Sequence, residues 1–127
     1  MEIEAYIVET ERYIVTLFGI DSKLYTDQYI SYLWENSANE EFKNNDIFIT
    51  ALISNRTLVC SKIRGCKLDE TAYVITTVRN PVEYVDEEKF FESFRNVINS
   101  IREELDYPSM TISIEKVEYF YFLQPRF

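Results

Sequence analysis

The chain has no histidine, and its 127 residues include only two glycines, three prolines and two cysteines. Without histidine it has no Ser-His-Asp or Cys-His nucleophile arrangement, no His-containing zinc site and no histidine pH switch. Two glycines are too few for a glycine-rich phosphate-binding loop, which excludes the usual nucleotide cradles. The shortage of glycine and proline predicts short loops and one domain, residues 1–127, without linkers.

The two cysteines, Cys60 and Cys66, do not make the disulfide framework of a small secreted protein. We expect two reduced thiols, with Cys60 in a strand and filling the core, and no metal or other cofactor. The first twelve residues, MEIEAYIVETER, lack a signal-peptide pattern, and no run approaches the ~18 apolar residues of a membrane-spanning helix. The expected location is the cytoplasm, or the host cytoplasm if the protein is viral. An abundance of Ile, Tyr, Phe, Asn and Lys indicates an AT-rich genome.

Acidic residues outnumber basic ones by 22 to 13, giving a formal charge of −9 at pH 7. This balance argues against direct nucleic-acid binding, which needs clustered Lys and Arg to neutralise phosphates. Hydrophobic residues make up 46% of the chain and aromatic residues 16%, enough to bury a core. The composition is that of a small, acidic, Tyr-rich globular domain.

The first part of the chain predicts two strands, over 2–9 and 12–18, because both runs are rich in β-branched and aromatic residues. Only Thr10 and Glu11 separate them, which suggests a hairpin. Apolar residues at helical spacing then predict a first helix over about 24–36, with a longer alternative that reaches Phe42.

Three further strand-like runs follow, over 47–53, 56–64 and 71–79. The second helix is the clearest element, with Asp86 as its N-cap and an apolar stripe running from Phe90 to Leu105. A last run, 110–123, predicts a final strand. Its apolar residues change parity near Glu115-Lys116, which indicates a bulge or bend.

The predicted order is therefore ββαβββαβ. Short turns between successive strands favour antiparallel pairing, and both helices need one apolar surface to pack on. We predict an α+β two-layer sandwich, with a mostly antiparallel sheet of about five to six strands packed against two helices.

A basic hairpin is the first candidate binding surface. Arg56, Lys62, Arg64 and Lys67 lie in a segment, 51–68, that contains no acidic residue. The pattern places Lys62 and Arg64 on one outward strand face, where they would contact a phosphate, an acidic partner or a second copy of the chain. The alternative is a solvated face that balances the acidic helices.

The aromatic C-terminal run is the second candidate surface. Its segment 119–123 is apolar on both faces, so either the strand is central in the sheet or its outer face is an interface. We predict a homodimer through Tyr119, Tyr121 and Leu123. The ten tyrosines could also line a ligand groove, although tyrosines more often lie at the rim of a core.

No catalytic pattern is apparent in the residues. The adjacent carboxylates Glu40-Glu41, Glu87-Glu88 and Glu103-Glu104 point about 100° apart on a helix and favour solvated surfaces. We therefore predict a non-enzymatic protein-interaction module that binds a protein partner or itself. The alternatives are a phage or archaeal-virus inhibitor that mimics nucleic acid, and a small-ligand binder or enzyme with a Tyr, Glu and Lys site.

Overall fold

The structure is a computed structural model that describes residues 5–66 and 70–122. The sheet contains four strands, and two α-helices and a short 3₁₀ helix complete the described part of the chain. In chain order the elements are β1 (Ala5–Phe18), α1 (Asp27–Asn45), β2 (Leu52–Thr57), η1 (Lys62–Arg64), β3 (Thr71–Val78), α2 (Glu87–Glu104) and β4 (Met110–Phe122).

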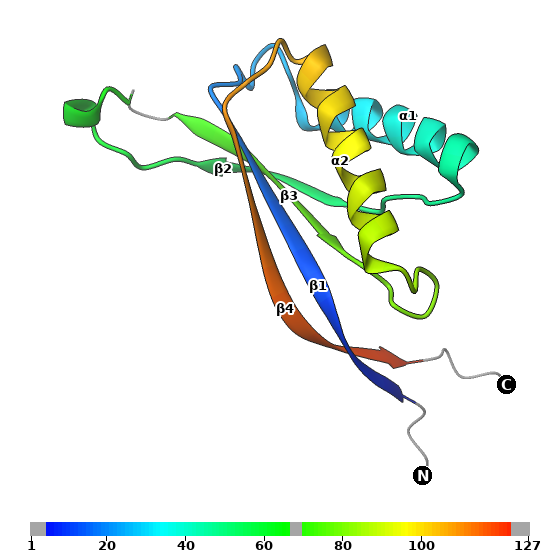
Figure 1. Cartoon of the computed structure of the whole chain (residues 1–127). Helices are drawn as coiled ribbons and strands as arrows, with labels where there is room; N and C mark the ends of the chain where they lie inside the picture. The colour runs from blue at the N-terminus through cyan, green and yellow to red at the C-terminus, as the bar shows by residue number, and fades with distance from the viewer. Residues whose placement is uncertain (1–4, 67–69, 123–127) are drawn as a thin grey trace, which may run out of the picture.

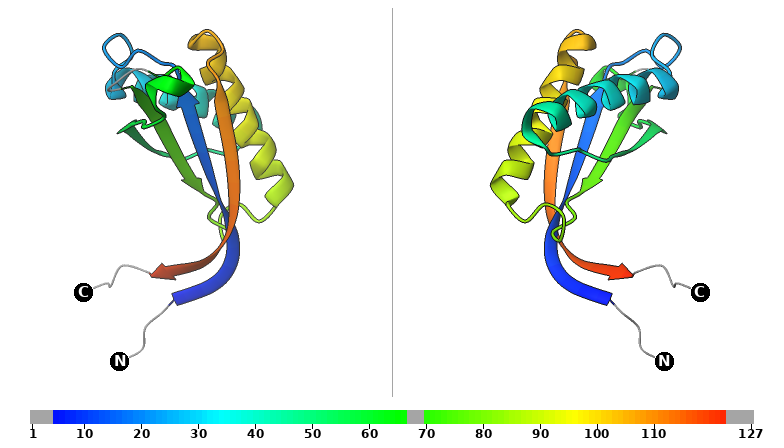
Figure 2. Two further views of the ribbon diagram at one scale, coloured as in Figure 1. Left: turned by 90° about the vertical axis from the view of Figure 1, so that its left-hand side faces the viewer. Right: turned by 90° about the vertical axis from the view of Figure 1, so that its right-hand side faces the viewer.

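The strands form one antiparallel sheet in the order β2-β3-β1-β4. Figures 1 and 2 show α1 and α2 side by side on one face of this sheet, so the molecule has two layers. Both ends of the described chain lie where β1 and β4 extend beyond the helices as a two-stranded ribbon. The predicted α+β class and antiparallel sheet are confirmed, but the prediction of five to six strands in the order ββαβββαβ is wrong.

One cause of the difference lies in β1, because the two strands predicted over 2–9 and 12–18 are one continuous strand. Thr10 and Glu11, predicted as a turn, are buried and extended. The hydroxyl of Thr10 donates to the carbonyl of Arg79 at 2.8 Å, and the Arg79 N–H donates to the Glu11 carbonyl at 3.2 Å. The Asn-Gly or Asp-Gly pair that favours a tight turn is absent here, and pairing with β4 continues without a break through both residues.

The second cause lies in the predicted strand 47–53, of which only the end enters the sheet. The carbonyl of Ile49 accepts from the indole N–H of Trp34 at 2.9 Å, and the Phe48 N–H donates to the Tyr84 hydroxyl at 3.1 Å. Since side chains of α1 and of the loop before α2 satisfy these groups, the apolar run joins the core without pairing as a strand. β2 begins at Leu52.

The predicted strand 56–64 ends at Thr57. Ser61 has φ +80° and Gly65 φ +89°, so the chain reverses there, and η1 lies between these two residues. A disulfide joins Cys60 to Cys66 across this turn, with 5.7 Å between their Cα atoms. The expectation of reduced thiols, with Cys60 in a strand, is therefore wrong.

The core lies between the sheet and the helices and confirms the apolar stripe of α2. Phe90, Phe94, Val97, Ile98 and Ile101 are all buried, and the Asp86 carboxylate caps the helix by accepting from the Lys89 N–H at 3.1 Å. They pack on the side chains that β1 directs toward the helices, which include Tyr13, Val15 and Leu17. From α1 come Ile30, Leu33, Trp34 and Ala38, and this helix agrees with the longer of the two predicted extents, since it starts at Asp27 and ends at Asn45, just beyond Phe42.

β4 is an edge strand, and its register with β1 is unbroken from Leu17↔Met110 to Ala5↔Phe122. Of the two predicted features near Glu115-Lys116, the unbroken register excludes a bulge, whereas a bend of the ribbon is present. The apolar residues of β4 change parity because the β1–β4 ribbon curves beyond the helices, as Figure 2 shows. A different side of β4 must then be shielded from water.

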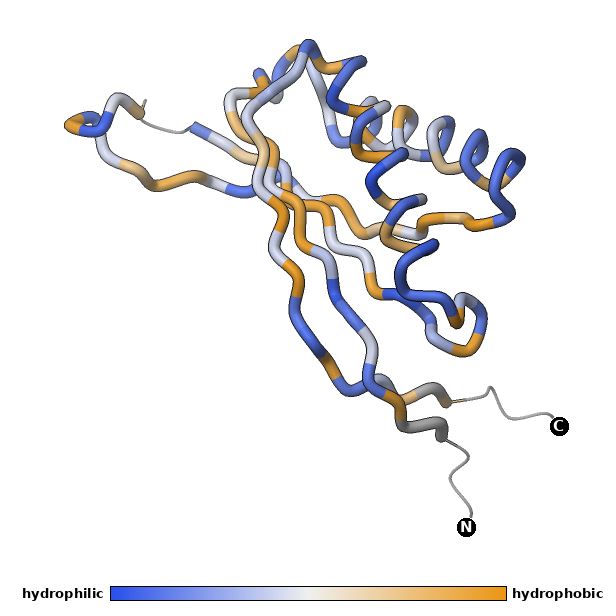
Figure 3. The backbone as a smooth tube through the Cα atoms, viewed as in Figure 1, coloured by the Kyte–Doolittle hydropathy of each residue, from blue (hydrophilic) through white to orange (hydrophobic). Residues whose placement is uncertain are grey.

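The other face of the sheet carries no helix in the described part of the chain. Leu52 and Val78 lie there, and Leu52 is 76% exposed. Figure 3 shows hydrophobic residues concentrated where the strands lie beside the helices and hydrophilic stretches where β1 and β4 extend beyond them. Among the described residues, no helix is both long enough and apolar enough to span a membrane.

Candidate functional site

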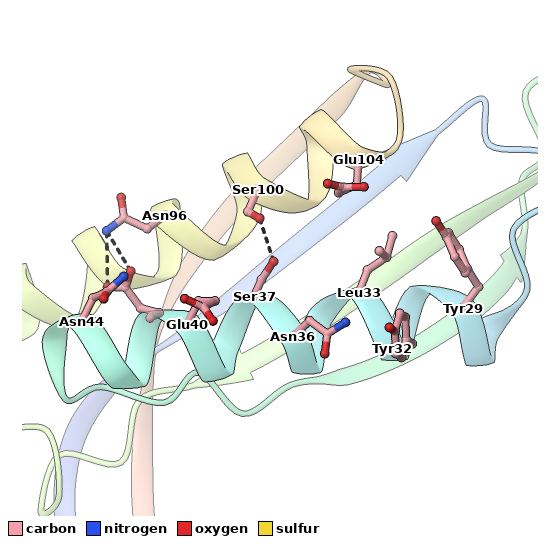
Figure 4. Close-up of a pocket in the computed structure, with 11 residues that line it drawn as sticks. Tyr29, Tyr32, Leu33, Asn36, Ser37, Glu40, Asn44, Asn96, Ser100 and Glu104 are labelled. Atoms are coloured by element: carbon pink, nitrogen blue, oxygen red, sulfur yellow. Dashed lines mark hydrogen bonds between the residues drawn. The ribbon is translucent and has the colours of Figure 1, made fainter.

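A cleft of about 440 Å³ lies between α1 and α2, on the side of the helices that faces away from the sheet. Figure 4 shows its walls, with α1 supplying most of the side chains and α2 the rest. We call it the interhelical cleft, and its lining residues are Tyr29, Tyr32, Leu33, Asn36, Ser37, Glu40, Glu41, Asn44, Asn96, Ser100 and Glu104. Its volume falls within the range of small-molecule sites.

Two polar contacts hold the helices together along this cleft. The hydroxyls of Ser37 and Ser100 are hydrogen bonded at 2.8 Å. Further along, the side-chain amide of Asn96 donates to both oxygens of the Glu41 carboxylate, at 3.1 and 3.3 Å. The spacing of the two helices is therefore set by polar groups that also line the cleft (Figure 4).

Glu41 is the unusual member of the lining, because it is only 7% exposed. Besides the Asn96 amide, its carboxylate accepts from the Asn45 side chain at 2.7 Å. Both donors are neutral, and no Lys or Arg nitrogen lies within 4.0 Å of it among the described residues. Buried carboxylates usually have a cationic partner, whereas the described residues give Glu41 only neutral ones.

The rest of the rim is aromatic and acidic. Tyr29 and Tyr32 are partly exposed along one side, and Glu40 and Glu104 are exposed carboxylates. Glu40 forms an ion pair with Lys43 at 3.6 Å. Both of these side chains are exposed to water, whereas Glu41 is buried. Aromatic faces and carboxylates are the groups that attract organic cations.

A second charged cluster joins β1, β3, β4 and α2. The Arg79 guanidinium donates to both oxygens of the buried Glu11 carboxylate, at 2.8 to 3.0 Å, and to the Tyr84 carbonyl at 2.8 Å. Lys116 lies 4.0 Å from Glu11 and 3.5 Å from Glu87. These groups satisfy one another's charge and hydrogen-bonding capacity.

The electrostatics of this cluster are those of a buried ion pair. Burial alone would raise the pKa of Glu11 and is the largest single effect, but the hydrogen bonds from Arg79, Glu87 and Thr10 and the charge of Arg79 together hold that pKa below its usual value. Burial, together with the Glu11 charge, raises the pKa of Tyr13 to about 12, so Tyr13 stays neutral. Among the described residues, no group of three or more Cys, Asp or Glu is placed to hold a metal ion.

Comparison with known proteins shows to which family the chain belongs. The sequence matches the model of the SAM lyase family over residues 8–123. The chain belongs to the SAM lyase family. No curated protein matches this family member in sequence.

Two solved structures of phage SAM lyases share the fold of this SAM lyase family member. The first is in complex with S-methyl-5′-thioadenosine and has a TM-score of 0.54 and 12% identity, covering 90% of each chain. The second is in the apo state and has a TM-score of 0.53 and 15% identity, covering 93% of this chain and 91% of the other. At these identities the likeness supports the fold alone.

Membership of the SAM lyase family overturns the leading prediction from the sequence. A lyase is an enzyme, so the non-enzymatic protein-interaction module, with protein binding as its role, is wrong. The prediction failed because it looked for catalytic patterns of known spacing, such as paired carboxylates and nucleophile-base sets. The SAM lyase family member has none of these in its sequence.

The predicted basic hairpin lies away from the interhelical cleft. Arg56 is exposed on β2, while Lys62 and Arg64 belong to η1 at the far end of the β2–β3 connection (Figure 1). They are not on a strand face as predicted, because the chain turns at Ser61. Ile63, between them, is 97% exposed. Lys67 lies outside the described residues.

The predicted aromatic interface is on the edge strand β4, so the alternative of a central strand is wrong. Tyr119 is half-buried, and the backbone of Tyr121 pairs with Tyr6. Leu123 lies outside the described residues, as does the Tyr121 side chain. The exposed aromatic residues here are Phe120 and Phe122, the latter 61% exposed.

Two of the predicted groove tyrosines, Tyr29 and Tyr32, do line the cleft, but sequence analysis missed Glu41. The sequence predicts Glu41, like Glu40, as a solvated carboxylate. A usable pattern was present, since Trp34, Ala38 and Glu41 continue the buried stripe of α1 at helical spacing. A charged residue on such a stripe indicates a charged group that is buried among apolar side chains, which is rare in proteins.

Proposed function

We propose that this chain cleaves S-adenosylmethionine (SAM) and releases S-methyl-5′-thioadenosine. The observation that carries the proposal is the family match over residues 8–123. The phage SAM lyase that shares the fold is in complex with S-methyl-5′-thioadenosine, which supports this compound as the product here. A lyase breaks the substrate without adding water.

The reaction balances without an added base or oxidant. The bond between the sulfonium sulfur and Cγ of the methionine-derived chain breaks, and its electron pair goes to sulfur. The substrate's own carboxylate oxygen bonds to Cγ, which leaves homoserine lactone with its ammonium group. SAM carries a net charge of about +1, and the products together carry the same charge. The protein's task is then to bind and orient the substrate and to exclude water.

The interhelical cleft is the site we assign to the substrate. Its volume of about 440 Å³ suits a nucleoside with an amino-acid arm. Tyr29 and Tyr32 offer rings for the adenine, and the carboxylates of Glu40, Glu41 and Glu104 face a substrate with two positive groups. The charged groups of the Glu11–Arg79 cluster already pair with one another, so it is the weaker candidate.

A pair of matched tryptophan substitutions tests this location. Asn36 lines the cleft and Asn39 does not, although both are exposed on α1. Asn36→Trp fills the cleft and should lower kcat/KM for SAM by about tenfold or more, while Asn39→Trp should leave it unchanged. Chromatography of S-methyl-5′-thioadenosine gives the rate, and mass spectrometry separates the lactone from homoserine, the product of hydrolysis.

The possible results separate the activity from its location. Wild-type protein that forms no S-methyl-5′-thioadenosine contradicts the activity itself. Wild-type activity with equal rates in Asn36→Trp and Asn39→Trp places the substrate elsewhere, with the uncovered face of the sheet as the next region to substitute.

We further propose that copies of this chain associate with one another, at the predicted aromatic edge and the uncovered sheet face. The exposed Phe120 and Phe122 on β4, and Leu52 on β2, support this proposal because water is a costly environment for such side chains. Phe120→Glu should reduce the mass measured by light scattering. The matched control is Glu118→Gln on the same strand, which should leave the mass unchanged. Unchanged mass in folded Phe120→Glu protein contradicts association through this edge.

A further inference from the structure

We propose that the end of the β2–β3 connection binds the surface of an anionic membrane. We call this segment, residues 59–66, the basic tip, and it contains η1. Figure 1 shows it far from both helices. Binding of this kind is peripheral and needs no membrane-spanning helix, and it does not depend on the proposed activity.

Two aliphatic side chains of the basic tip are almost fully in water. Val59 is 90% exposed and Ile63 is 97% exposed, the two highest values among the large hydrophobic side chains of the described residues. Neither belongs to the described core or packs against it. Both can therefore enter the apolar phase of a membrane interface without displacing any other part of the fold.

The charges beside these side chains are positive. Lys62 and Arg64 flank Ile63, and segment 51–68 contains no acidic residue. Among the described residues, no carboxylate oxygen lies within 4.0 Å of either cation. Each Lys or Arg near an anionic lipid surface raises the affinity about fivefold. The tip thus combines an apolar group that inserts with cations that remain at the headgroups.

The acidic remainder of the chain, which brings the total charge to −9, does not prevent this approach. Charges in water are screened beyond ~8 Å at physiological ionic strength. The helices lie away from the tip in Figure 1, so their carboxylates repel the lipid surface weakly. The same charge distribution orients the molecule, with the tip toward the membrane and the helices away from it.

The backbone of the basic tip already satisfies its own hydrogen bonds. The Ser61 carbonyl accepts from the N–H groups of Arg64 and Cys66, each at 3.1 Å, and its hydroxyl accepts from the Ile63 N–H at 3.2 Å. The disulfide between Cys60 and Cys66 closes the same turn. Paired N–H groups can enter a weakly hydrated interface without losing bonds, and a turn that is fixed beforehand loses little entropy on binding.

These features favour lipid over other anionic partners. Single-stranded nucleic acid is bound largely by aromatic stacking, and segment 51–66 has no aromatic residue. An acidic protein would need a pocket shaped for Ile63, and it could not bond to the backbone N–H groups that Ser61 already occupies. A lipid surface needs no such pocket, because its apolar phase adapts to both aliphatic side chains.

Flotation of the full chain with lipid vesicles tests the proposal. The vesicles contain phosphatidylcholine alone, or phosphatidylcholine with about 30% of the anionic phosphatidylglycerol. Wild-type protein should float mainly with the anionic vesicles, and the bound fraction should fall as salt is raised from about 50 to about 500 mM. Ile63→Ser should lower the affinity for anionic vesicles about fivefold, and Lys62→Glu about tenfold or more.

Two variants outside the tip are the matched controls. Val85→Ser removes an aliphatic side chain that is 78% exposed, and Lys89→Glu reverses an exposed charge on α2. Both should float like the wild type, and circular dichroism confirms that every variant is folded.

Several results would overturn the proposal. They are the absence of wild-type binding to anionic vesicles, wild-type binding in both tip variants, and equal losses in the controls. Retention on immobilised polyglutamate without vesicle binding also overturns it, and would indicate an acidic protein partner instead. None of these measurements involves SAM cleavage, so failure of the proposed activity leaves them unchanged.

Discussion

Replacing Arg79 by methionine should destabilise the protein strongly, because it leaves the Glu11 carboxylate buried without its main partner. Arg79 is 6% exposed, and its guanidinium holds both oxygens of a carboxylate that is 1% exposed. Removing one member of a buried ion pair costs about 3–5 kcal/mol of unfolding free energy. Lys116, at 4.0 Å, compensates only weakly, since its side chain is largely in water.

The pH dependence of this variant distinguishes a lost ion pair from a lost packing contact. In the wild type the folded-state pKa of Glu11 is lowered, so the pair stabilises the protein above the unfolded value of 4.5. That stability is lost as pH falls through the lowered folded pKa. In Arg79→Met burial dominates and raises the pKa of Glu11, so the carboxylate is protonated more readily. The deficit relative to wild type should therefore be larger at pH 7 than at pH 5.

Urea unfolding followed by the fluorescence of the single, buried Trp34 measures both quantities. Arg12→Met is the control, because Arg12 forms an ion pair with Glu115 on the same strands but its side chain is 42% exposed, and ion pairs in contact with water contribute about 0–1 kcal/mol. A deficit for Arg79→Met that is the same at pH 5 and pH 7 would refute the electrostatic explanation. A deficit no larger than that of Arg12→Met would refute the burial of the pair.

Two further variants test the core and the predicted basic surface. Phe94→Ala should lower the unfolding free energy by about 3–5 kcal/mol, because Phe94 is fully buried and contacts Tyr13 at 4.9 Å between ring centroids; a silent result in urea would contradict the placement of α2. Replacing both Lys62 and Arg64 with Glu should barely change the melting temperature, because η1 is exposed. A sharp fall in melting temperature would show that these residues are structural.

The sequence predicted elements well where one pattern decides the structure. The stripe of α2 and its Asp86 cap are local features, and both were found. The errors occurred where tertiary contacts override local preference. An apolar run around Ile49 has the composition of a strand. The Ile49 carbonyl, however, accepts a hydrogen bond from the indole N–H of Trp34, and the run does not pair in the sheet. Thr10 and Glu11 were predicted as a turn because Arg79, 68 residues away, was not visible as their partner.

The interhelical cleft was harder to predict than the fold, for a reason that follows from its construction. Its walls come from two helices separated by more than 40 residues, and no motif of fixed spacing connects Ser37 with Ser100 or Glu41 with Asn96. A carboxylate on a solvated helix face and one on a buried stripe can be adjacent in the sequence. They differ only in their position around the helix axis. Because Glu41 lies on the phase of Ile30, Leu33 and Trp34, its burial is predictable, whereas its lack of a cationic partner depends on what α2 brings to it. That missing partner, and not the number of acidic residues, distinguishes this carboxylate chemically from the others on the helices.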